Sequence, residues 1–336
     1  MKSIKHSNIP IFLPEQACPH QCVFCNQVKI SGTLSVPDPQ DVQGIVETHL
    51  STMYEKRIVD IAFFGGSFTG ISIDLQEKYL KEAFNFIQNG LVAGIRVSTR
   101  PDYITKEKLD LLKKYGVTTI EIGAQSTNNE VLNKSGRGHN FEAIKNAAAL
   151  ILENGFQLGL QMMIGLPHDT FERSLRTANE ISALGAHCTR IYPTVIIKET
   201  ALEKLYSKGN YKPLSLEDAV EWTKELVKVF EKNNINILRI GLHPSEELVD
   251  GKSLVAEPFH PSFKEMVMSK IWNELIFEEM KNRKGDKVTF RVNDKQLNFA
   301  VGFNAVNKKE LAQKGISTRF IADPNLTKYQ FDVSYN

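Results

Sequence analysis

The chain has 336 residues, of which 42% are hydrophobic and 24% are charged, and its formal net charge is only +2. These values are ordinary for a globular protein: they exclude a highly charged disordered chain, and no apolar run is long enough to span a membrane. The length suits one α/β barrel with a small additional unit, and the N-terminus lacks the apolar core of a secretory signal, so we expect a cytoplasmic protein.

A repeated theme runs from residue 9 to residue 241: a short apolar or β-branched run, a corner rich in Gly, Pro, Ser or Thr, and then an amphipathic helix. That alternation is typical of βα units on a parallel sheet. Strands are predicted at residues 9–13, 58–64, 94–99, 118–123, 157–164 and 187–192, with a weaker seventh at 235–241. Helices are predicted at residues 41–54, 74–89, 106–115, 141–153, 171–184 and 216–232.

Helix ends and the C-terminal region complete the prediction. Gly90, Gly116 and Gly155 follow predicted helices, which suits left-handed C-terminal caps. After a further helix at 263–283, the pattern changes to predicted short strands around a helix near 307–314. Those strands are predicted at 288–292, 297–301, 317–321 and 329–333. We therefore expect a partial (β/α)6, TIM-like barrel over residues 1–283 and a small α+β appendix over 284–336, which would cap the barrel or grip substrate.

A loop after the first predicted strand holds three of the four cysteines, Cys18, Cys22 and Cys25. Thiolates spaced this closely bind zinc or an iron–sulfur cluster. Structural zinc takes four protein ligands, but His20 is poorly placed between two of the cysteines, and Cys188 starts its strand and is expected at the other end of the barrel. Three thiolates would leave one iron of a four-iron cluster open. The spacing favours iron–sulfur, with zinc and a disulfide as the alternatives.

Other polar or glycine-rich corners also follow strands, on the face where barrels place their working loops. They include Gly65-Gly66 after the second strand, Arg100 and Asp102 after the third, and Gln125 after the fourth. Each has a structural interpretation too: Gly-Gly suits a tight turn, and Pro-Asp is a common turn and helix-entry signal. Their shared position after strands favours a common site.

Together these motifs carry a family resemblance. The C-x3-C-x2-C spacing, followed by a Gly-Gly corner after the next strand, resembles the radical S-adenosylmethionine (SAM) superfamily. Over residues 9–263 the chain is more specifically similar to the radical SAM domain of the Elongator catalytic subunit family, with the oxygen-independent coproporphyrinogen oxidases as more distant relatives. The motifs are FFGGSFTG at 63–70, STRPD at 98–102, EIGAQS at 121–126, RGH at 137–139, QMMIGLP at 161–167 and RIYP at 190–193.

The resemblance implies two cofactors and a reaction type. A [4Fe–4S] cluster would be bound by Cys18, Cys22 and Cys25, and SAM would chelate its open iron. One electron from an external flavodoxin- or ferredoxin-like donor would cleave SAM to methionine and a 5′-deoxyadenosyl radical, which abstracts hydrogen from a substrate.

The resemblance also assigns residues to the SAM site. Phe24 would lie near the adenine, and Gly65, Gly66 and Ser67 would contact the SAM amino group, although many relatives have a carboxylate where Ser67 stands. Two glutamines and an arginine complete the predicted contacts. They are Gln125 and Gln161, as polar contacts to SAM, and Arg137, as the partner of its methionine carboxylate.

RNA, and tRNA in particular, is the leading substrate by resemblance alone. The acetyltransferase half of the Elongator family is not recognisable here, and the start of the chain carries too few basic residues for an RNA-binding arm. Two alternatives stay open: a radical SAM enzyme that acts on a small metabolite or tetrapyrrole, and a non-catalytic, metal-stabilised RNA-binding module.

Overall fold

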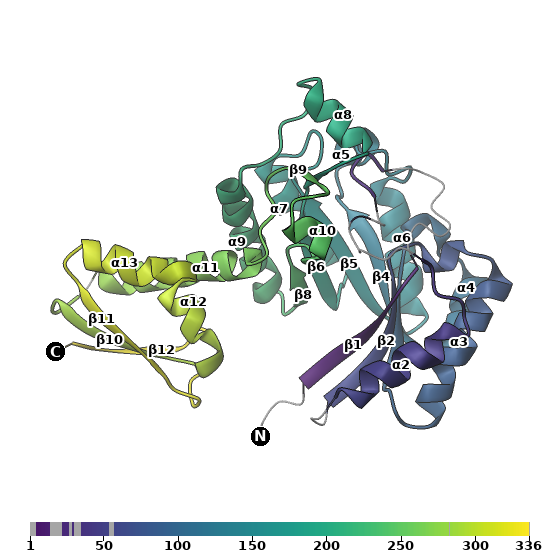
Figure 1. Cartoon of the computed structure of the whole chain (residues 1–336), viewed down its shortest axis with the longest axis horizontal. Coiled ribbons are helices and arrows are strands. Elements are labelled where there is room, and N and C mark those ends of the chain that lie inside the picture. Colours follow the sequence, from purple (N-terminus) through teal and green to yellow (C-terminus); the bar gives the residue numbers. More distant parts are fainter. Residues whose placement is uncertain are drawn as a thin grey trace.

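The structure, a computed structural model, describes residues 5–13, 22–26, 29, 35–53, 57–281 and 283–335. Its centre is a seven-stranded parallel sheet in the order β1-β2-β3-β4-β5-β6-β8 (Figure 1). The strands are β1 (Lys5–Phe12), β2 (Arg57–Phe64), β3 (Gly94–Thr99), β4 (Val117–Gln125), β5 (Gln157–Ile164), β6 (Cys188–Pro193) and β8 (Asn236–Ile240). Strands β1 and β8 are the two edges, so the sheet forms the predicted partial barrel, and all seven predicted strands are confirmed.

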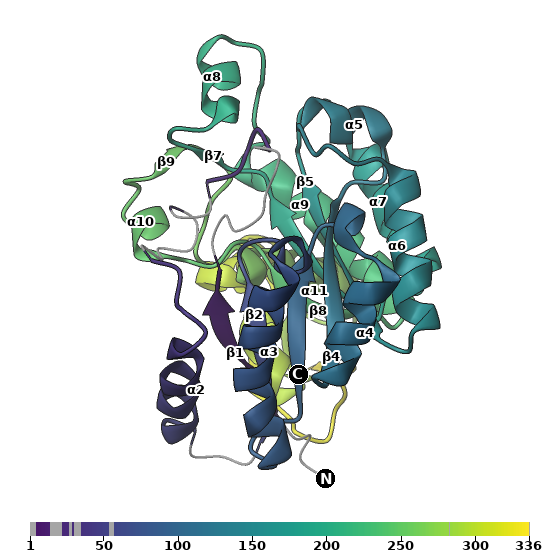
Figure 2. The same ribbon diagram turned by 90° about the vertical axis from the view of Figure 1, so that its right-hand side faces the viewer.

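Helices cover the convex side of this sheet, as the two perpendicular views show (Figures 1 and 2). All six predicted barrel helices are confirmed, and a short one, α5, was not predicted. They are α2 (Asp41–Ser51), α3 (Ile73–Gln88), α4 (Lys106–Lys114), α5 (Asn129–Lys134), α6 (Phe141–Glu153), α7 (Phe171–Ala183) and α9 (Leu216–Lys232). Side-chain caps fix several starts: Thr105, Asn140 and Thr170 each accept a hydrogen bond from a first-turn backbone N–H.

Strand alternation separates an apolar layer from a polar one. In β4, Ile120 and Ile122 are fully buried in the main apolar core, between the sheet and its helices. Glu121, between them, points to the concave side of the sheet, and Gly123 lies on the same side, because successive residues of a strand face opposite ways. The glycines predicted to end helices have positive φ values, +67° at Gly90 and +70° at Gly116.

Several short elements lie beyond the sheet near the carboxyl ends of its strands. They are β7 (Ile196–Ile197) and β9 (Leu254–Ala256), which pair antiparallel, and the helices α8 (Ala201–Ser207) and α10 (Glu246–Val249). The sequence did not predict them because elements this short have no clear periodicity. None of the helices in the part of the chain that the structure describes is both long and apolar enough to cross a membrane.

The appendix is a three-stranded sheet, in the order β11-β10-β12, with short helices on one face. Its elements are β10 (Lys287–Val292), α12 (Leu297–Val301), α13 (Val306–Gln313), β11 (Ser317–Ala322) and β12 (Phe331–Tyr335). The prediction of a strand at 297–301 was wrong, because this segment forms α12. Asn293 caps the turn before it, and an alternating run of only five residues cannot distinguish a strand from one helical turn.

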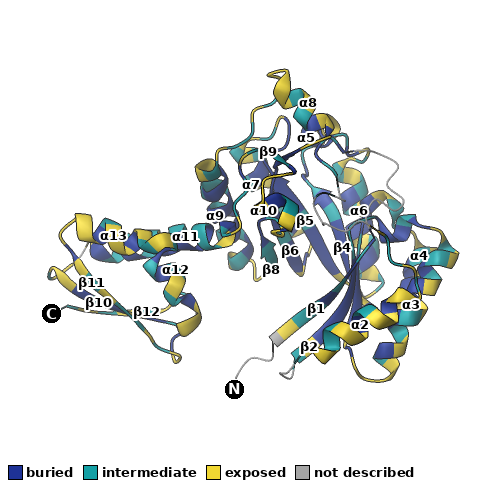
Figure 3. Cartoon of the chain, in the orientation of Figure 1, coloured by how far each residue is buried: buried dark blue, intermediate teal, exposed yellow. Residues whose placement is uncertain are grey.

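Helix α11 (Phe263–Met280) joins the two units. Val267 and Ile271 belong to the core of the barrel, whereas Trp272 and Ile276 belong to a second core with the appendix. Figure 3 shows the barrel sheet largely buried, with the appendix extending from the side of β8. The appendix therefore does not lie over the carboxyl ends of the strands. Helix α11 therefore contributes to both cores. The boundary between barrel and appendix at residues 283/284 stays a prediction.

Candidate functional site

The described part of the cysteine loop is held between two helices. The backbone N–H of Val23 donates to the carbonyl of Ser135 at 3.0 Å, and the Val23 carbonyl accepts from Leu202 at 2.7 Å. A tight turn, in which Cys25 N–H donates to the Cys22 carbonyl at 3.0 Å, brings the two cysteines together. Cys18 lies outside the described residues, and no set of three His, Cys, Asp or Glu ligands occurs within them.

Arg137 connects this loop to the end of β4. Its side chain is only 7% exposed, and Nη1 donates to Cys22 Sγ at 3.2 Å while Nη2 donates to the Gly123 carbonyl at 2.7 Å. Nε donates to His139 Nε2 at 3.3 Å. A guanidinium has five N–H donors, so, counting described partners, one N–H on each terminal nitrogen is left for a further acceptor. Such a fork matches a carboxylate.

The end of β4 packs closely against this guanidinium. A Cβ at Gly123 would lie 3.0 Å from Gln125 Nε2 and 3.3 Å from Arg137 Nη2, so any other residue here would crowd both groups. Gln125 itself has a φ of +67°, and its buried Oε1 has no hydrogen-bond donor among the described residues. A buried acceptor without a partner is costly in a folded protein. The geometry is that of a site that a polar ligand would complete.

Arg100, itself paired with Asp102, holds the backbone of Arg137 in place. Arg100 Nη2 donates to the Arg137 carbonyl at 2.6 Å, and the guanidinium pairs with both carboxylate oxygens of Asp102 at 2.9 Å. Burial acts to raise the pKa of Asp102, but the hydrogen bond and charge of Arg100 hold it below its usual value. Of the two interpretations of this corner, the contacts favour the structural one.

His139 is the acceptor that fixes Arg137 Nε, and a ring nitrogen can accept only in neutral imidazole. Burial, followed by the charges of Arg137 and Arg100, lowers the pKa of His139 to about 4. The folded protein therefore binds fewer protons at this residue than the unfolded chain, whose histidine pKa is about 6.5. Stability is retained above pH ~6.5 and is lost as the pH falls toward 4.

We expect His139→Gln to remove that part of the pH dependence. Urea unfolding of the wild type and the variant between pH 4 and pH 7.5 measures it, and the difference in unfolding free energy should change mainly between pH 6.5 and 4. His168→Gln is the control, because His168 is about half exposed and pairs with Glu130 at 2.9 Å. If the unfolding free energies of the wild type and His139→Gln changed in parallel with pH, the imidazole of His139 would not be held neutral by the fold.

The predicted Gly-Gly corner follows β2, two strands away from β4, which Arg137 contacts. Gly65 has a φ of +102°, which glycine adopts readily. Gly66 and Ser67 line a small pocket together with Ser98, at the end of β3. Gln161 Nε2 approaches Ser98 Oγ at 3.5 Å, and Gln161 is the neighbour of Gly123 in the register of β4 and β5. The predicted SAM residues therefore form two groups, one around Arg137 and Gln125 and one around Gly66 and Ser67. Gln161 neighbours both, through Gly123 on one side and Ser98 on the other.

Phe24 lies on the apolar side of the loop. It is 9% exposed and packs in a small apolar cluster with Cys22. The cluster also contains Val131, Met163, Leu166, Ile196 and Leu202. Met163 belongs to this wall and Met162 is fully buried in the main core, so both methionines fill space between apolar side chains.

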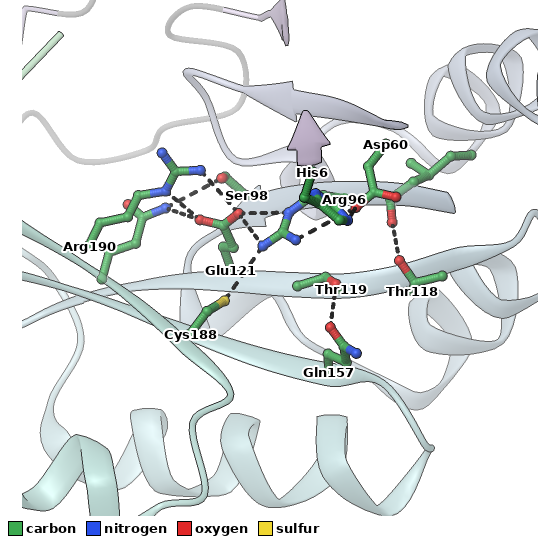
Figure 4. A network of polar contacts seen from close by, with 12 residues as sticks. His6, Asp60, Arg96, Ser98, Thr118, Thr119, Glu121, Gln157, Cys188 and Arg190 are labelled. Atoms are coloured by element: carbon green, nitrogen blue, oxygen red, sulfur yellow. Dashed lines mark hydrogen bonds and ion pairs between the residues drawn. The ribbon is translucent and has the colours of Figure 1, made fainter. Parts of the chain in front are cut away.

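A buried charge network at the centre of the sheet was not predicted (Figure 4). Glu121, whose side chain is 1% exposed, accepts hydrogen bonds from Arg96 Nη2 at 3.0 Å and from Arg190 Nε at 2.6 Å. Gln161 Nε2 donates to the same carboxylate at 3.2 Å. Burial acts to raise the pKa of Glu121, but Arg190 and Arg96 hold it below its usual value.

The network also contacts two residues of β2. Arg96 also lies 3.7 Å from Asp60, and the Arg190 guanidinium lies over the Phe64 ring at 4.8 Å. Cys188 Sγ accepts from Arg96 Nη2 at 3.5 Å, and burial raises the pKa of its thiol to about 11. A neutral thiol is a poor metal ligand. One feature of the sequence could have indicated this buried network: a charged residue in the middle of an apolar strand, as in Ile120-Glu121-Ile122.

The comparisons with known proteins decide the family. A model of the radical SAM superfamily matches residues 14–181, and a radical SAM C-terminal domain model matches residues 186–273. The chain belongs to the radical SAM superfamily. It is therefore a radical SAM enzyme in the broad sense of that family, whose members act on different substrates.

Individual relatives confirm the predicted resemblance to the Elongator catalytic subunit family. The chain is 24% identical to the tRNA uridine(34) acetyltransferase of Methanocaldococcus jannaschii, over 63% of this chain and 47% of that protein, and 30% identical to human Elongator complex protein 3, over 48% and 34%. Elp3 of Methanocaldococcus infernus, with its N-terminus deleted, has the same fold, with a TM-score of 0.64 at 19% identity over 84% of this chain and 65% of that chain. The chain spans less than two thirds of the length of each of these three.

The described residues fit the cofactors of a radical SAM protein. The Arg137 guanidinium donates to the sulfur of Cys22, one of the three cysteines of the loop. The unpaired Gln125 Oε1 and the remaining N–H groups of Arg137 would bind a polar molecule next to Cys22. The assignment of individual residues to cluster and SAM remains a prediction.

Proposed function

We propose that the protein uses a [4Fe–4S] cluster, bound by Cys18, Cys22 and Cys25, to cleave SAM reductively and to modify an RNA, with tRNA as the leading substrate. The observation that carries the proposal is the contact from Arg137 to Cys22, which joins the cysteine loop to a polar corner with a buried, unpaired acceptor. When bound, these cofactors supply one-electron cleavage of SAM and abstraction of hydrogen.

The chain's own residues would hold and shield the reactants. Arg137 would donate to Cys22 Sγ and offer its remaining N–H groups to the SAM carboxylate, while Gln125 Oε1 would accept a hydrogen bond from the ligand. Gly65, Gly66 and Ser67 would receive the SAM amino group, and Gln161 would contact SAM from β5. The apolar wall that includes Phe24 excludes water from this side. A flavodoxin- or ferredoxin-like protein in the cytoplasm would supply the electron.

RNA is proposed as the substrate because two relatives bear the names tRNA uridine(34) acetyltransferase and Elongator complex protein 3. Mass spectrometry of tRNA nucleosides from a strain that lacks the protein tests this directly. We expect one modified nucleoside to disappear or its precursor to accumulate, and the wild-type gene should restore the profile. An unchanged profile would contradict the RNA substrate.

Arg137→Lys tests the proposed carboxylate fork. Lysine keeps the charge but cannot donate to Cys22, Gly123 and a carboxylate in one plane. Loss of hydrogen bonds to a charged group costs about 1.5–3 kcal/mol, so the dissociation constant for SAM should rise roughly 10- to 150-fold. Equilibrium dialysis of SAM with anaerobically reconstituted protein measures this.

The matched control for that variant is Arg173→Lys. Arg173 also pairs with an acidic residue, Glu130 at 2.7 Å, but on the surface. We expect this variant to bind SAM as the wild type does. If Arg137→Lys bound SAM as tightly as the wild type at equal iron content, Arg137 would not be a SAM-binding residue.

A further inference from the structure

The appendix presents one face of its sheet to a core and leaves the other face open. Val288, Phe290 and Val292 of β10 are buried against α11, α12 and α13. The residues between them point the opposite way. Lys287 and Arg291 are exposed, and both flank Thr289.

Register places further polar residues on this open face. In β11, Ser317 and Arg319 lie beside Lys287 and Thr289, and both are exposed. In β12, Ser334 lies beside Thr289, and Asp332 lies beside Arg291. We call the residues Lys287, Thr289, Arg291, Ser317, Arg319, Ile321, Asp332 and Ser334 the open sheet face. It carries three cations and one carboxylate, and it has no aromatic side chain.

Charge is distributed unevenly between the two parts of the chain. Residues 284–336 contain nine Lys or Arg and five Asp or Glu, a net charge of +4, whereas the whole chain has a net charge of only +2. The rest of the chain is therefore slightly acidic. A basic appendix on an acidic barrel is a local electrostatic feature that the balanced total conceals.

The cations of the open sheet face differ from two lysines on α9 and α11, the helices beside the appendix. Along α9 and α11, Lys224 pairs with Glu274 at 2.5 Å and Lys270 pairs with Glu221 at 3.1 Å. No ion pair within the described residues engages Lys287, Arg291 or Arg319. Their charges are consequently available to an external anion.

We propose that the open sheet face binds the phosphate backbone of the RNA substrate. This inference rests on the proposed RNA-modifying function and gives the appendix a role in it. Three cations on a polar sheet suit phosphate oxygens, with serine and threonine hydroxyls as further donors. Because aromatic rings are absent from the face, bases have no stacking platform, and the contact is independent of sequence.

An acidic protein such as the electron donor fits this position less well. A donor must approach the cysteine loop, which is hydrogen-bonded between α5 and α8. Figures 1 and 2 show α8 at the top of the barrel and the appendix well below it, on the far part of α11. A long RNA can contact both places, whereas a small redox protein on the open sheet face would not reach the loop.

Salt-dependent binding of an unmodified tRNA transcript tests the proposal. The full-length sheet variant Lys287→Gln, Arg291→Gln, Arg319→Gln is compared with the wild type by fluorescence anisotropy between 50 and 200 mM salt. The loss of three phosphate contacts should reduce the slope of log K against log salt by roughly 2–3. At the lower salt concentrations we expect at least a tenfold loss of affinity.

A barrel variant with the same loss of charge is the matched control. Lys78, Lys81 and Lys113 are exposed on α3 and α4 and form no ion pair within the described residues, so their replacement by glutamine should leave the slope unchanged. Trp272, which lies in the core shared with the appendix and donates to Gln296 at 3.1 Å, reports by its fluorescence whether the appendix stays folded.

The outcomes separate this inference from the proposed function. If the wild type does not bind tRNA, the RNA substrate and this surface are both wrong. If the wild type binds but the folded sheet variant keeps its slope, or the barrel variant loses as much, the open sheet face is not the RNA site. Loss of binding to an acidic flavodoxin, with tRNA binding intact, would assign the face to a protein instead.

Discussion

Replacing Cys22 by alanine is expected to leave anaerobically reconstituted protein without its cluster. The wild type should contain about four irons per chain and absorb broadly in the visible range. Cys22 is the cysteine that Arg137 contacts, and its removal leaves only two thiolates in the loop, too few to retain a four-iron cluster. Iron analysis and visible absorbance of the purified protein measure the loss.

The chain offers a close control for that variant. Cys188 is as buried as Cys22, at 5% against 7% exposed, but its sulfur contacts Arg96 in the central network. We expect Cys188→Ala to reconstitute with the same iron content as the wild type. Iron retained by Cys22→Ala, or lost equally by Cys188→Ala, would contradict the assignment of the loop as the cluster site.

The second large effect concerns stability. Glu121→Gln keeps the size of the side chain but leaves Arg96 and Arg190 buried without the carboxylate between them. Removal of one partner of a buried ion pair costs about 3–5 kcal/mol, because the remaining charge stays desolvated. Asp60 compensates little, since it lies 3.7 Å from Arg96 alone. Urea unfolding monitored by circular dichroism measures the change in unfolding free energy.

An exposed pair provides the comparison. Asp110 pairs with Lys106 on the surface of α4, and both side chains are more than half exposed. Asp110→Asn should change the unfolding free energy by less than about 1 kcal/mol. If Glu121→Gln costs as little as Asp110→Asn, the central network does not hold the sheet together.

The barrel could be predicted from sequence because its units repeat one signal. Strands 94–99 and 157–164 and helices 141–153 and 216–232 have the predicted bounds, since turn residues and apolar periodicity agree at both ends. The appendix was harder. Residues 297–301 became a helix because Asn293 caps the preceding turn, a contact that five alternating residues do not reveal.

The site could be predicted only in part, for a physical reason. Spacing indicated Cys22, the position after a strand indicated Gln125, and the resemblance to the radical SAM family indicated Arg137; the structure brings the three together. The Glu121 network depends on side chains that five neighbouring strands, β2 to β6, bring to one face. Such contacts depend on register and curvature, which a single sequence does not specify.

The central claim is that the cysteine loop and the β4 corner form one site for cluster and SAM. The most direct test is to incubate the anaerobically reconstituted full-length chain with SAM and a strong reductant and to quantify 5′-deoxyadenosine and methionine. We predict that both products form in equal amounts, and that Cys22→Ala forms neither. A colourless protein that carries one zinc, or an iron-loaded protein that leaves SAM intact, would contradict the account.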